Sequence, residues 1–530
     1  MGIRDRQRLL AALVAATALL SAGSAVAAGK PADPAVVRTD VGAVRGTVAD
    51  GVRTFQGIPF AAPPVGELRW KPPQPVRPWT TTRDATVAGS ACPQDANPES
   101  PGGSTNEDCL YLNVTTPQAP ARRPHAVLVW VPGGGFFEGA GSSYQAQRMV
   151  TRGDVVVVTV NYRLGIFGFF GHDGLADSGT FGLQDQQAAL RWVRRNAAAF
   201  GGDPHNVTLA GESAGGMSTC AQLTSPGSAG LFAKAVMQSG SCAFDWPAGG
   251  QYPGQEAGSF WLPQADVRTL GGQVSGDLGC PGGAEALECL RKLPAGDLLK
   301  QTLAFVSPAY GTTTLPENPA TAMRAGRFQP VPVLSGNNHD EATAWVSAFD
   351  GGAIDAPGYH RLIVDMVGAR RAAKVEAEYP VTSYASPAVA WSVVTTDRIW
   401  SCNQVTTDRQ LAGRVPTYAY EFSDKFSPLT KFTPSPIPLG AAHAMELPYL
   451  FSLGGANLPF EPDQQRLSDE MIDYWTAFAR GGDPNGPGRP HWAPVRGEVS
   501  GLSLAPSGQG GIQRVDLAAE HHCGFWSTLG

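Results

Sequence analysis

The sequence predicts an α/β fold with a large, mostly parallel central sheet, and three observations lead to it. Residues 127–131 and 155–160 are continuous apolar runs, typical of strands buried on both faces of a parallel sheet. Residues 183–200 have helical periodicity and stop at Gly201-Gly202-Asp203-Pro204, a strong helix-ending signal. A further β-branched run then leads into Gly-x-Ser-x-Gly at residues 211–215. Strands that alternate with crossover helices indicate the α/β class.

The stretch around Ser213 is the centre of the functional prediction. An apolar run at residues 207–210 precedes it, and residues 217–223 are compatible with a helix. A strand, a sharp turn and a helix are the context of a nucleophile elbow, which lifts the serine hydroxyl above the sheet edge. At a helix N-terminus, exposed N–H groups and the helix dipole favour negative charge. An ordinary loop serine is the competing interpretation, since a chain with 64 glycines forms such patterns by chance.

A glycine-rich loop follows the first apolar strand, at Pro132-Gly133-Gly134-Gly135-Phe136-Phe137. Acyl transfer needs N–H donors aimed at the developing oxyanion, and glycines leave backbone N–H groups accessible. The position fits the second oxyanion element of a hydrolase, and the N–H of Ala214 is the expected partner donor. A plain glycine-rich turn is the alternative.

The remaining partners are an acid and a histidine, expected in the order Ser, acid, His. Asp340 and Glu341 lie just beyond a strand at residues 331–334, and His443 lies on the loop after a strand at residues 418–422. Neighbouring side chains in an extended loop point apart, so we expect only one of the two acids to reach His443. His521 and His522, near the C-terminus, are expected to lie on the surface.

The N-terminus has the features of a secretory signal peptide at residues 1–28. Three arginines precede an apolar run at residues 9–20, and Ala25-Val26-Ala27 is a small-x-small cleavage site. The run is shorter than the ~20 residues that a membrane helix needs. An uncleaved anchor is the alternative, but a secreted protein with no stable membrane anchor is the prediction. The precursor charge of −6 includes no basic stripe, so nucleic acid is not an expected partner.

Eight cysteines in an exported chain suggest disulfides. Cys92 and Cys109 bracket a polar loop, and Cys280 and Cys289 bracket a short acidic segment, so both pairs are candidates for local bridges. Spacing alone does not pair the other four, Cys220, Cys242, Cys402 and Cys523.

No repeat or linker divides the rest of the chain, and residues 29–530 are predicted to form a single catalytic domain. Residues 41–60 alternate apolar and polar side chains, which indicates an antiparallel hairpin at the sheet edge. Residues 355–409 are helical in composition and are expected to cap the sheet as an insertion. Residues 471–480 form a late amphipathic helix before Gly481-Gly482-Asp483-Pro484.

Nearly the whole mature chain resembles the carboxylesterase type B family, the α/β-hydrolases that include the cholinesterases. Residues 107–114, Glu-Asp-Cys-Leu-Tyr-Leu-Asn-Val, resemble one family signature. Residues 181–186 and 211–216, Phe-Gly-Leu-Gln-Asp-Gln and Gly-Glu-Ser-Ala-Gly-Gly, resemble the other. Residues 55–60 and 63–66 also fit. Together these motifs are highly specific.

The resemblance implies a bacterial secreted carboxylesterase with Ser213 as nucleophile, Glu341 as acid and His443 as base. Gly134, Gly135 and Ala214 match the family's oxyanion donors. The implied disulfides are Cys92–Cys109, Cys280–Cys289 and Cys402–Cys523, which leaves Cys220 and Cys242 either paired or free. The implied reaction is ester hydrolysis through an acyl-enzyme, with a small-molecule ester and water as partners and no metal or other cofactor. His443 would act as the neutral base, with an apparent pKa near about 6.5 that the neighbouring carboxylate can raise.

Two departures bear on the substrate. The loop between Cys92 and Cys109 contains no aromatic residue, whereas cholinesterases carry there a tryptophan that binds a quaternary ammonium. Specialisation for choline esters is therefore not expected. Pro132 replaces the Tyr or His that often precedes the three glycines. The alternatives to an esterase are a lipase acting on water-insoluble acylglycerols and a non-catalytic binding protein of the same fold, although all three triad positions are filled.

Overall fold

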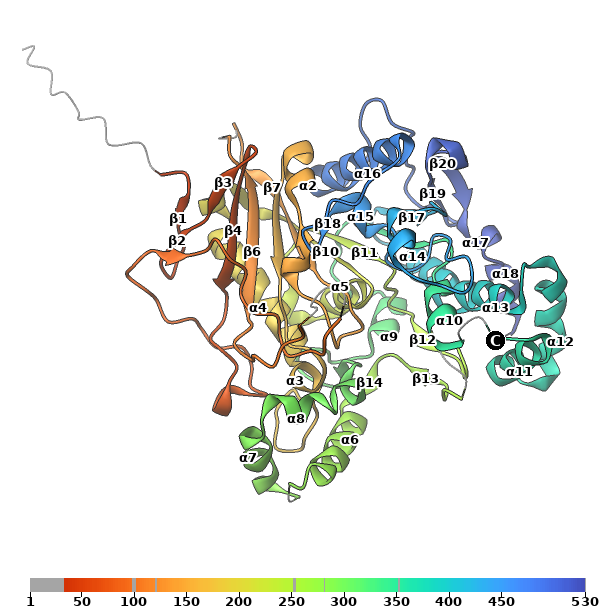
Figure 1. Cartoon of the computed structure of the whole chain (residues 1–530), viewed down its shortest axis with the longest axis horizontal. Coiled ribbons are helices and arrows are strands. Elements are labelled where there is room, and N and C mark those ends of the chain that lie inside the picture. The colour runs from red at the N-terminus through yellow and green to blue at the C-terminus, as the bar shows by residue number, and fades with distance from the viewer. Residues whose placement is uncertain are drawn as a thin grey trace, which may run out of the picture.

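The structure is a computed structural model that describes residues 33–97, 102–119, 122–250, 254–280, 282–350 and 353–529 (Figure 1). The expected signal peptide, residues 1–28, lies outside the described residues. One large sheet runs through the molecule from the N-terminal strands to the C-terminal strands, with helices on both faces (Figure 1).

The central sheet has eleven strands, of which the middle ones are parallel. Its order from one edge is β20 (Gln513–Asp516), β19 (Ser500–Leu504), β17 (Thr417–Phe422), β16 (Val333–Asn338), β11 (Lys234–Gln238), β10 (Gly202–Glu212), β7 (His125–Val131), β9 (Val156–Val160), β6 (Tyr111–Pro117), β4 (Val52–Pro59) and β3 (Thr47–Ala49). Every pair from β19 to β9 is parallel, and the outer pairs are antiparallel. The predicted mostly parallel sheet with an N-terminal antiparallel edge hairpin is confirmed.

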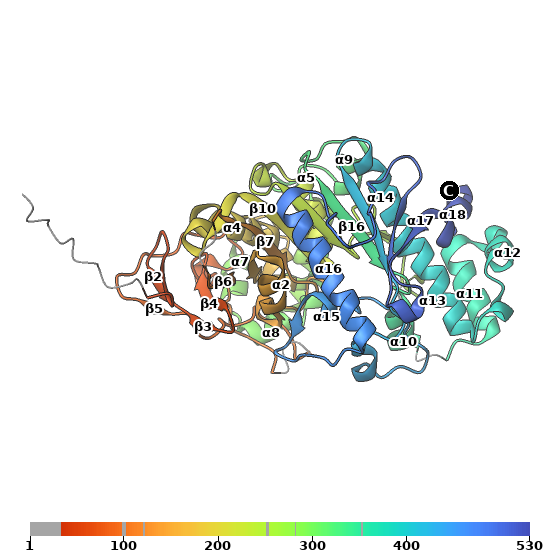
Figure 2. The same cartoon turned by 90° about the horizontal axis from the view of Figure 1, so that it is seen from above.

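Two layers of helices bury the two faces of the sheet, and this explains the continuous apolar strands. In β7, Val127, Val129 and Val131 pack into the core that includes α4 (Phe181–Asn196) and α5 (Ala214–Thr224). Leu128 and Trp130 pack into the core that includes α16 (Pro462–Gly481) and α2 (Gln147–Gly153). Figure 2 shows α16 lying across its face of the sheet. Each fully buried aliphatic side chain contributes ~1.5–3 kcal/mol.

Helical insertions lie at two places outside the sheet. The first contains α6 (Gln264–Asp277), α7 (Ala284–Lys292) and α8 (Ala295–Leu299), at the bottom of Figure 1. The second contains α10 (Thr343–Asp350), α11 (Ala356–Val367), α12 (Ala369–Glu378) and α13 (Pro387–Thr395), and it leads through a π-helical turn, Thr396–Ser401, into α14 (Cys402–Ala412). The predicted helical character of residues 355–409 is thus confirmed.

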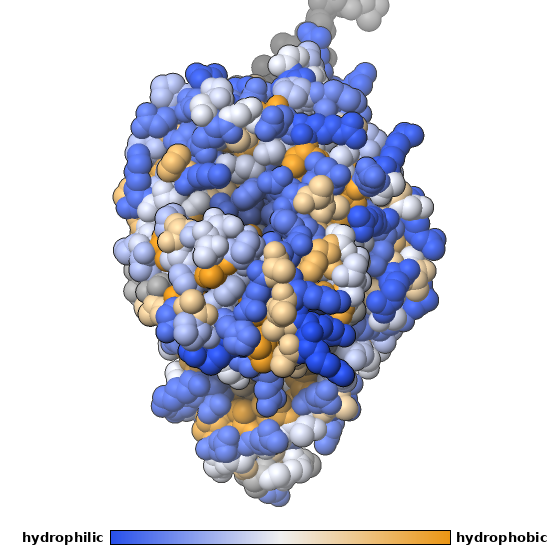
Figure 3. Space-filling model, turned by 90° about the vertical axis from the view of Figure 1, so that its right-hand side faces the viewer, coloured by the Kyte–Doolittle hydropathy of each residue, from blue (hydrophilic) through white to orange (hydrophobic). Residues whose placement is uncertain are grey.

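The surface at the end of the molecule that carries the second insertion is mainly hydrophilic. Hydrophobic side chains are scattered over it and gather mostly in its lower part (Figure 3). Within the described part of the chain, no helix combines the length and the apolar character needed to cross a membrane.

Two element boundaries differ from the sequence prediction. β16 runs through Gly336 to Asn338 instead of ending at Leu334. A Cβ on Gly336 would lie 2.2 Å from the carbonyl oxygen of Tyr420, so glycine here permits a close approach of β17 inside the sheet and does not mark a loop. α16 begins well before residue 471, at Pro462, where Glu461 and Gln464 form a capping box.

Four disulfides pair all eight cysteines: Cys92–Cys109, Cys220–Cys242, Cys280–Cys289 and Cys402–Cys523. Cys220 and Cys242, left open by the sequence, are therefore bonded. The Cys402–Cys523 bridge spans 121 residues, for which a chain-entropy model gives ~5 kcal/mol of stabilisation through the unfolded state. It ties the C-terminal α18 (Cys523–Leu529) to α14.

Candidate active site

Ser213 stands at a sharp turn between β10 and α5. Its backbone has φ 55° and ψ −121°, a conformation that costs a non-glycine residue ~1–3 kcal/mol. Close backbone contacts explain why glycines stand on either side of Glu212-Ser213-Ala214. A Cβ on Gly211 would lie 2.4 Å from the carbonyl carbon of Gly215, and a Cβ on Gly215 would lie 2.0 Å from the carbonyl oxygen of Val131. The Ser213 N–H donates to the carbonyl of Gln238 at 2.9 Å, which fixes the turn against β11.

The glycine-rich loop after β7 lies beside this turn. A Cβ on Gly133 would lie 3.2 Å from the Cβ of Ser213. Gly134 and Gly135 have φ values of 94° and 57°, which glycine adopts readily. Among the described residues, neither of their N–H groups has a hydrogen-bond acceptor. Ala214 is the first residue of α5, where the N–H has no partner inside the helix. The loop and the helix start therefore offer N–H donors next to Ser213.

Glu341 and His443 form a buried pair at the same edge of the sheet. Oε2 of Glu341 lies 2.6 Å from Nδ1 of His443, while its Oε1 accepts the N–H of Asn338 at 2.8 Å. Asp340 points the other way: its Oδ2 accepts the N–H of Ala441 at 2.8 Å. Of the two adjacent acids, Glu341 therefore contacts His443 and Asp340 does not.

The other imidazole nitrogen of His443 faces the serine turn. Nε2 lies 3.1 Å from Oε1 of Glu212, the residue directly before Ser213. No hydrogen bond joins Nε2 to Oγ of Ser213, although both residues are described. The structure thus brings Glu341, His443 and the serine turn together, with Glu212 in the place next to Nε2.

Sequence reasoning gave no role to several residues around His443. Glu446 is fully buried and accepts hydrogen bonds from Gln238 at 3.0 Å and Asn338 at 2.8 Å. The rings of Trp345 and Trp400 lie 4.5 and 4.7 Å from the imidazole, between centroids. Glu212 could have been noted as part of the serine motif. Trp345 could have been noted from its position one helical turn after Glu341, but the placement of Trp400 depends on the tertiary fold.

Three buried carboxylates set the charge of His443. Burial alone would lower the pKa of the imidazole, but Glu212, Glu341 and Glu446 outweigh it and raise the pKa of His443 to about 9. Burial raises the pKa of Glu446.

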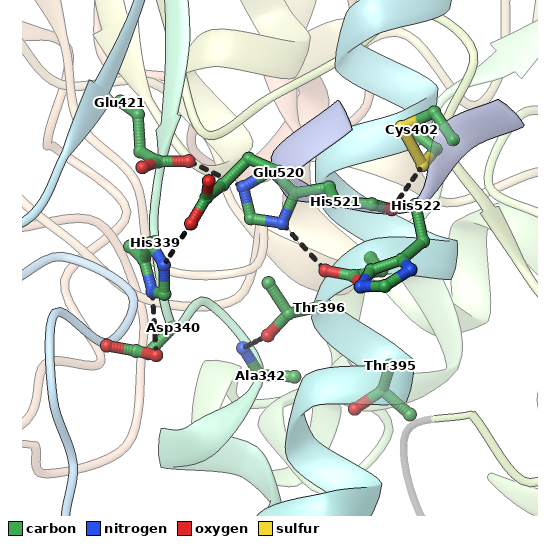
Figure 4. Close-up of polar contacts among 12 residues, drawn as sticks. His339, Asp340, Ala342, Thr395, Thr396, Cys402, Glu421, Glu520, His521 and His522 are labelled. Atoms are coloured by element: carbon green, nitrogen blue, oxygen red, sulfur yellow. Dashed lines mark hydrogen bonds and ion pairs between the residues drawn. A yellow bond between two sulfur atoms is a disulfide. The ribbon is translucent and has the colours of Figure 1, made fainter. Parts of the chain in front are cut away.

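The prediction that His521 lies on the surface is wrong. His521 is only 4% exposed. Its ring nitrogens lie 2.6 Å from Asp397 and 2.5 Å from Glu421, and Figure 4 shows the contact with Glu421. The disulfide Cys402–Cys523 and α17 (Leu517–Glu520) fold the C-terminus back onto the sheet, and periodicity near a chain end does not reveal this. His522 is half-buried and contacts Glu378 at 2.5 Å.

The order of the strands, and the serine turn at the edge where the parallel strands have their C-terminal ends, define an α/β-hydrolase. The family model of the carboxylesterase family matches residues 33–526. Para-nitrobenzyl esterase of Bacillus subtilis (strain 168) is 35% identical over 85% of this chain and 90% of its own length. Cocaine esterase of Homo sapiens is 34% identical over 83% of this chain and 81% of its own length. The solved structure of a thermophilic PNB esterase matches with a TM-score of 0.76 and 31% identity, over 93% of this chain and all of that one.

The chain therefore belongs to the carboxylesterase family, and it is a carboxylic-ester hydrolase.

The raised pKa of His443 predicts an alkaline activity profile. If His443 is the catalytic base, the role expected from the sequence, it must be neutral to act, so activity is low while the imidazole is protonated and rises as the pH passes the pKa of His443 in the folded protein. We expect kcat/KM for p-nitrophenyl butyrate to rise towards a midpoint at about 9 instead of the ordinary ~6.5. Glu212→Gln should move this midpoint to lower pH, because the charge of Glu212 is one of the main contributions that raise the pKa of His443. A wild-type profile that is level above pH 7 contradicts this electrostatic account.

Proposed function

We propose that this protein is an exported carboxylesterase that hydrolyses esters through a Ser213–His443–Glu341 triad and an acyl-enzyme. The observation that carries the proposal is the buried 2.6 Å contact between Glu341 and His443, at the sheet edge where the strained Ser213 turn also lies. The order of the three residues along the chain is that of α/β-hydrolases.

In the proposed mechanism, Nε2 of His443 takes the proton of Ser213 as Oγ attacks the ester carbonyl carbon. The N–H groups of Gly134, Gly135 and Ala214 stabilise the resulting oxyanion. Collapse of the tetrahedral intermediate releases the alcohol, which receives the proton from His443. Water then attacks the acyl-enzyme while His443 takes its proton. Collapse of this second tetrahedral intermediate breaks the bond to Oγ of Ser213, which receives the proton back from His443, and the carboxylic acid leaves. Glu341 accepts the Nδ1–H, fixes the tautomer and stabilises the imidazolium.

The contact between His443 and Glu212 has a consequence for the first step. In the structure Nε2 lies next to Glu212, one residue from the nucleophile. We infer that the imidazole shifts from the Glu212 carboxylate to Oγ of Ser213 when substrate binds. Catalytic hydrogen bonds are often long before substrate arrives and shorten in the complex.

Variants of the three residues test the triad. Ser213→Ala and His443→Ala should fold and lose on the order of 10⁶-fold in kcat, because serine and histidine act as one unit. Glu341→Gln should lose somewhat less, because it keeps its shape but no longer stabilises the cation. Initial rates with p-nitrophenyl acetate, and circular dichroism to verify folding, measure this. An inactive Asp340→Asn beside a nearly normal Glu341→Gln would mean that the acid is wrongly assigned.

Export is part of the proposal. The expected signal peptide at residues 1–28 is its first support. Its second is the set of four disulfides, because such bridges persist in oxidising compartments and are rare in the cytosol.

The loop between Cys92 and Cys109 favours an esterase over a lipase. Residues 98–101 lie outside the described residues, but the rest of the loop is fixed. Gln94 is buried and exchanges two hydrogen bonds with Gly139 at 3.0 and 3.1 Å, and its backbone pairs with Ser104. Glu107 binds Arg69 in a largely buried ion pair. A loop held in this way, without large apolar side chains, is poorly suited to opening on a lipid surface.

We therefore expect soluble short- to medium-chain esters to be hydrolysed without activation at an interface. Each methylene buried in a lipid interface would contribute about 0.8 kcal/mol, but the sequence of this loop has no large apolar side chain to bury. It contains four acidic and no basic residues, and those not paired with a cation, as Glu107 is with Arg69, are repelled by anionic lipid. The measurement is the rate against tributyrin concentration across saturation, beside emulsified triolein. A sharp rise at saturation, or triolein turnover rivalling that of p-nitrophenyl butyrate, would favour the lipase.

A further inference from the structure

The residues on both sides of Glu341 are held by side chains from outside their own loop. His339 and Asp340 come before Glu341, and Ala342 follows it. We define these four residues, 339–342, as the acid loop. The contacts that fix it lead to the C-terminal residues 520–523, which we define as the C-terminal clasp (Figure 4).

The first connection runs through His339. Its Nε2 lies 3.4 Å from Oε1 of Glu520 in the clasp, and its Nδ1 lies 2.9 Å from Oδ1 of Asp340. Burial works against the charge of His339, but Asp340 and Glu520 outweigh it and raise the pKa of His339 to about 11. The imidazole is therefore a cation between two carboxylates.

Asp340 carries this connection on to the loop of His443. Its Oδ2 accepts the N–H of Ala441, and its own N–H donates to the carbonyl of Ala441 at 3.0 Å. A Cβ on Gly440 would lie 2.2 Å from this Oδ2, so glycine is needed for the approach. Asp340 thus joins the acid loop to the chain two residues before His443.

The second connection holds the other side of Glu341. The N–H of Ala342 donates to Oγ1 of Thr396 at 3.0 Å. Thr396 begins the π-helical turn that also carries Asp397 and Trp400. Asp397 binds His521 of the clasp, and Trp400 packs on the ring of His443.

The clasp itself is firmly anchored. His521 bridges Asp397 and Glu421 in a buried site, and these carboxylates raise the pKa of His521 to about 10 against the effect of burial. His522 binds Glu378, and Cys523 is bonded to Cys402. Removing one partner of a buried charge pair such as His521 with Asp397 strongly destabilises a fold, so these contacts and the disulfide hold the clasp in place.

We propose that the C-terminal clasp, through Glu520–His339–Asp340 and His521–Asp397–Thr396, positions Glu341 against His443 for catalysis. The proposal rests on the triad proposed above. The clasp residues are positioning residues, since they act on the reaction through Glu341. Loosening either connection lets the Glu341 carboxylate drift from Nδ1, which weakens stabilisation of the imidazolium in the transition state and leaves ester binding unchanged. A small misplacement of this kind can cost up to ~10²-fold in rate.

The test uses two variants that remove one connection each. Thr396→Val keeps the shape of the side chain but removes the acceptor for Ala342, and Thr396→Ser restores it. Glu520→Ala removes the clasp's carboxylate from His339 and leaves Asp340 as its partner, and Glu520→Gln restores an acceptor oxygen. The readouts are kcat and KM for p-nitrophenyl butyrate, with thermal unfolding to show that the assayed protein is folded. We expect Thr396→Val and Glu520→Ala each to lower kcat about tenfold with KM within about twofold, and Thr396→Ser and Glu520→Gln to recover most of kcat.

Matched controls separate positioning from a general loss of structure. Thr395 is adjacent and buried, and its hydroxyl donates to Trp391 inside the helix at 2.8 Å, so Thr395→Val should keep the wild-type kcat. Glu376 makes the same kind of pair with His360 at 2.6 Å, on α11 and α12 at the surface, so Glu376→Ala should also keep it.

Either of two results overturns the proposal: Thr396→Val and Glu520→Ala keep the wild-type kcat, or they lose no more than their controls. An active Ser213→Ala would instead overturn the proposed function, and the clasp proposal with it.

Discussion

The contact between Glu341 and His443 depends on the parallel sheet more than on any local motif. Glu341 follows β16 and His443 follows β17, and these strands are neighbours in parallel register, so both loops leave the same edge of the sheet. Ser213 leaves β10 at that edge, two strands away from β16. The apolar helix layers on both faces are what make a parallel sheet of this kind stable. The geometry of the site therefore follows from burial of the strands on both sides.

Placing three carboxylates around one buried histidine has an electrostatic cost that the structure offsets locally. The Glu341 carboxylate accepts the N–H of Asn338 and contacts Nδ1 of His443. The Glu446 carboxylate accepts hydrogen bonds from the side chains of Gln238 and Asn338. The imidazolium form of His443 is correspondingly favoured. The negative charge of these carboxylates stabilises the imidazolium of His443, and it therefore also keeps His443 protonated near neutral pH before substrate binds. In the proposed mechanism, stabilisation of the imidazolium and the expected alkaline activity profile then have one cause.

Much of this could be predicted from the sequence, because the signals are local. The apolar strands, the helix stop at Gly201 and the glycines around Ser213 each report a nearby steric or burial constraint. The choice of Glu341 over Asp340 rested on resemblance, since side-chain direction after β16 depends on where that strand ends, and its end was predicted too early. His521 was misjudged because its partners Asp397 and Glu421 lie 124 and 100 residues away in the chain. Periodicity reports the environment of a segment and gives no information on partners distant in the chain.

The assignment of Ser213 as nucleophile is the central claim, and covalent labelling tests it most directly. The folded enzyme is treated with a fluorophosphonate, digested and analysed by mass spectrometry. The account predicts one adduct per chain on the peptide that contains Ser213, none on Ser213→Ala, and slower labelling of His443→Ala. An adduct on a different residue, or labelling of Ser213→Ala equal to that of the wild type, would contradict it.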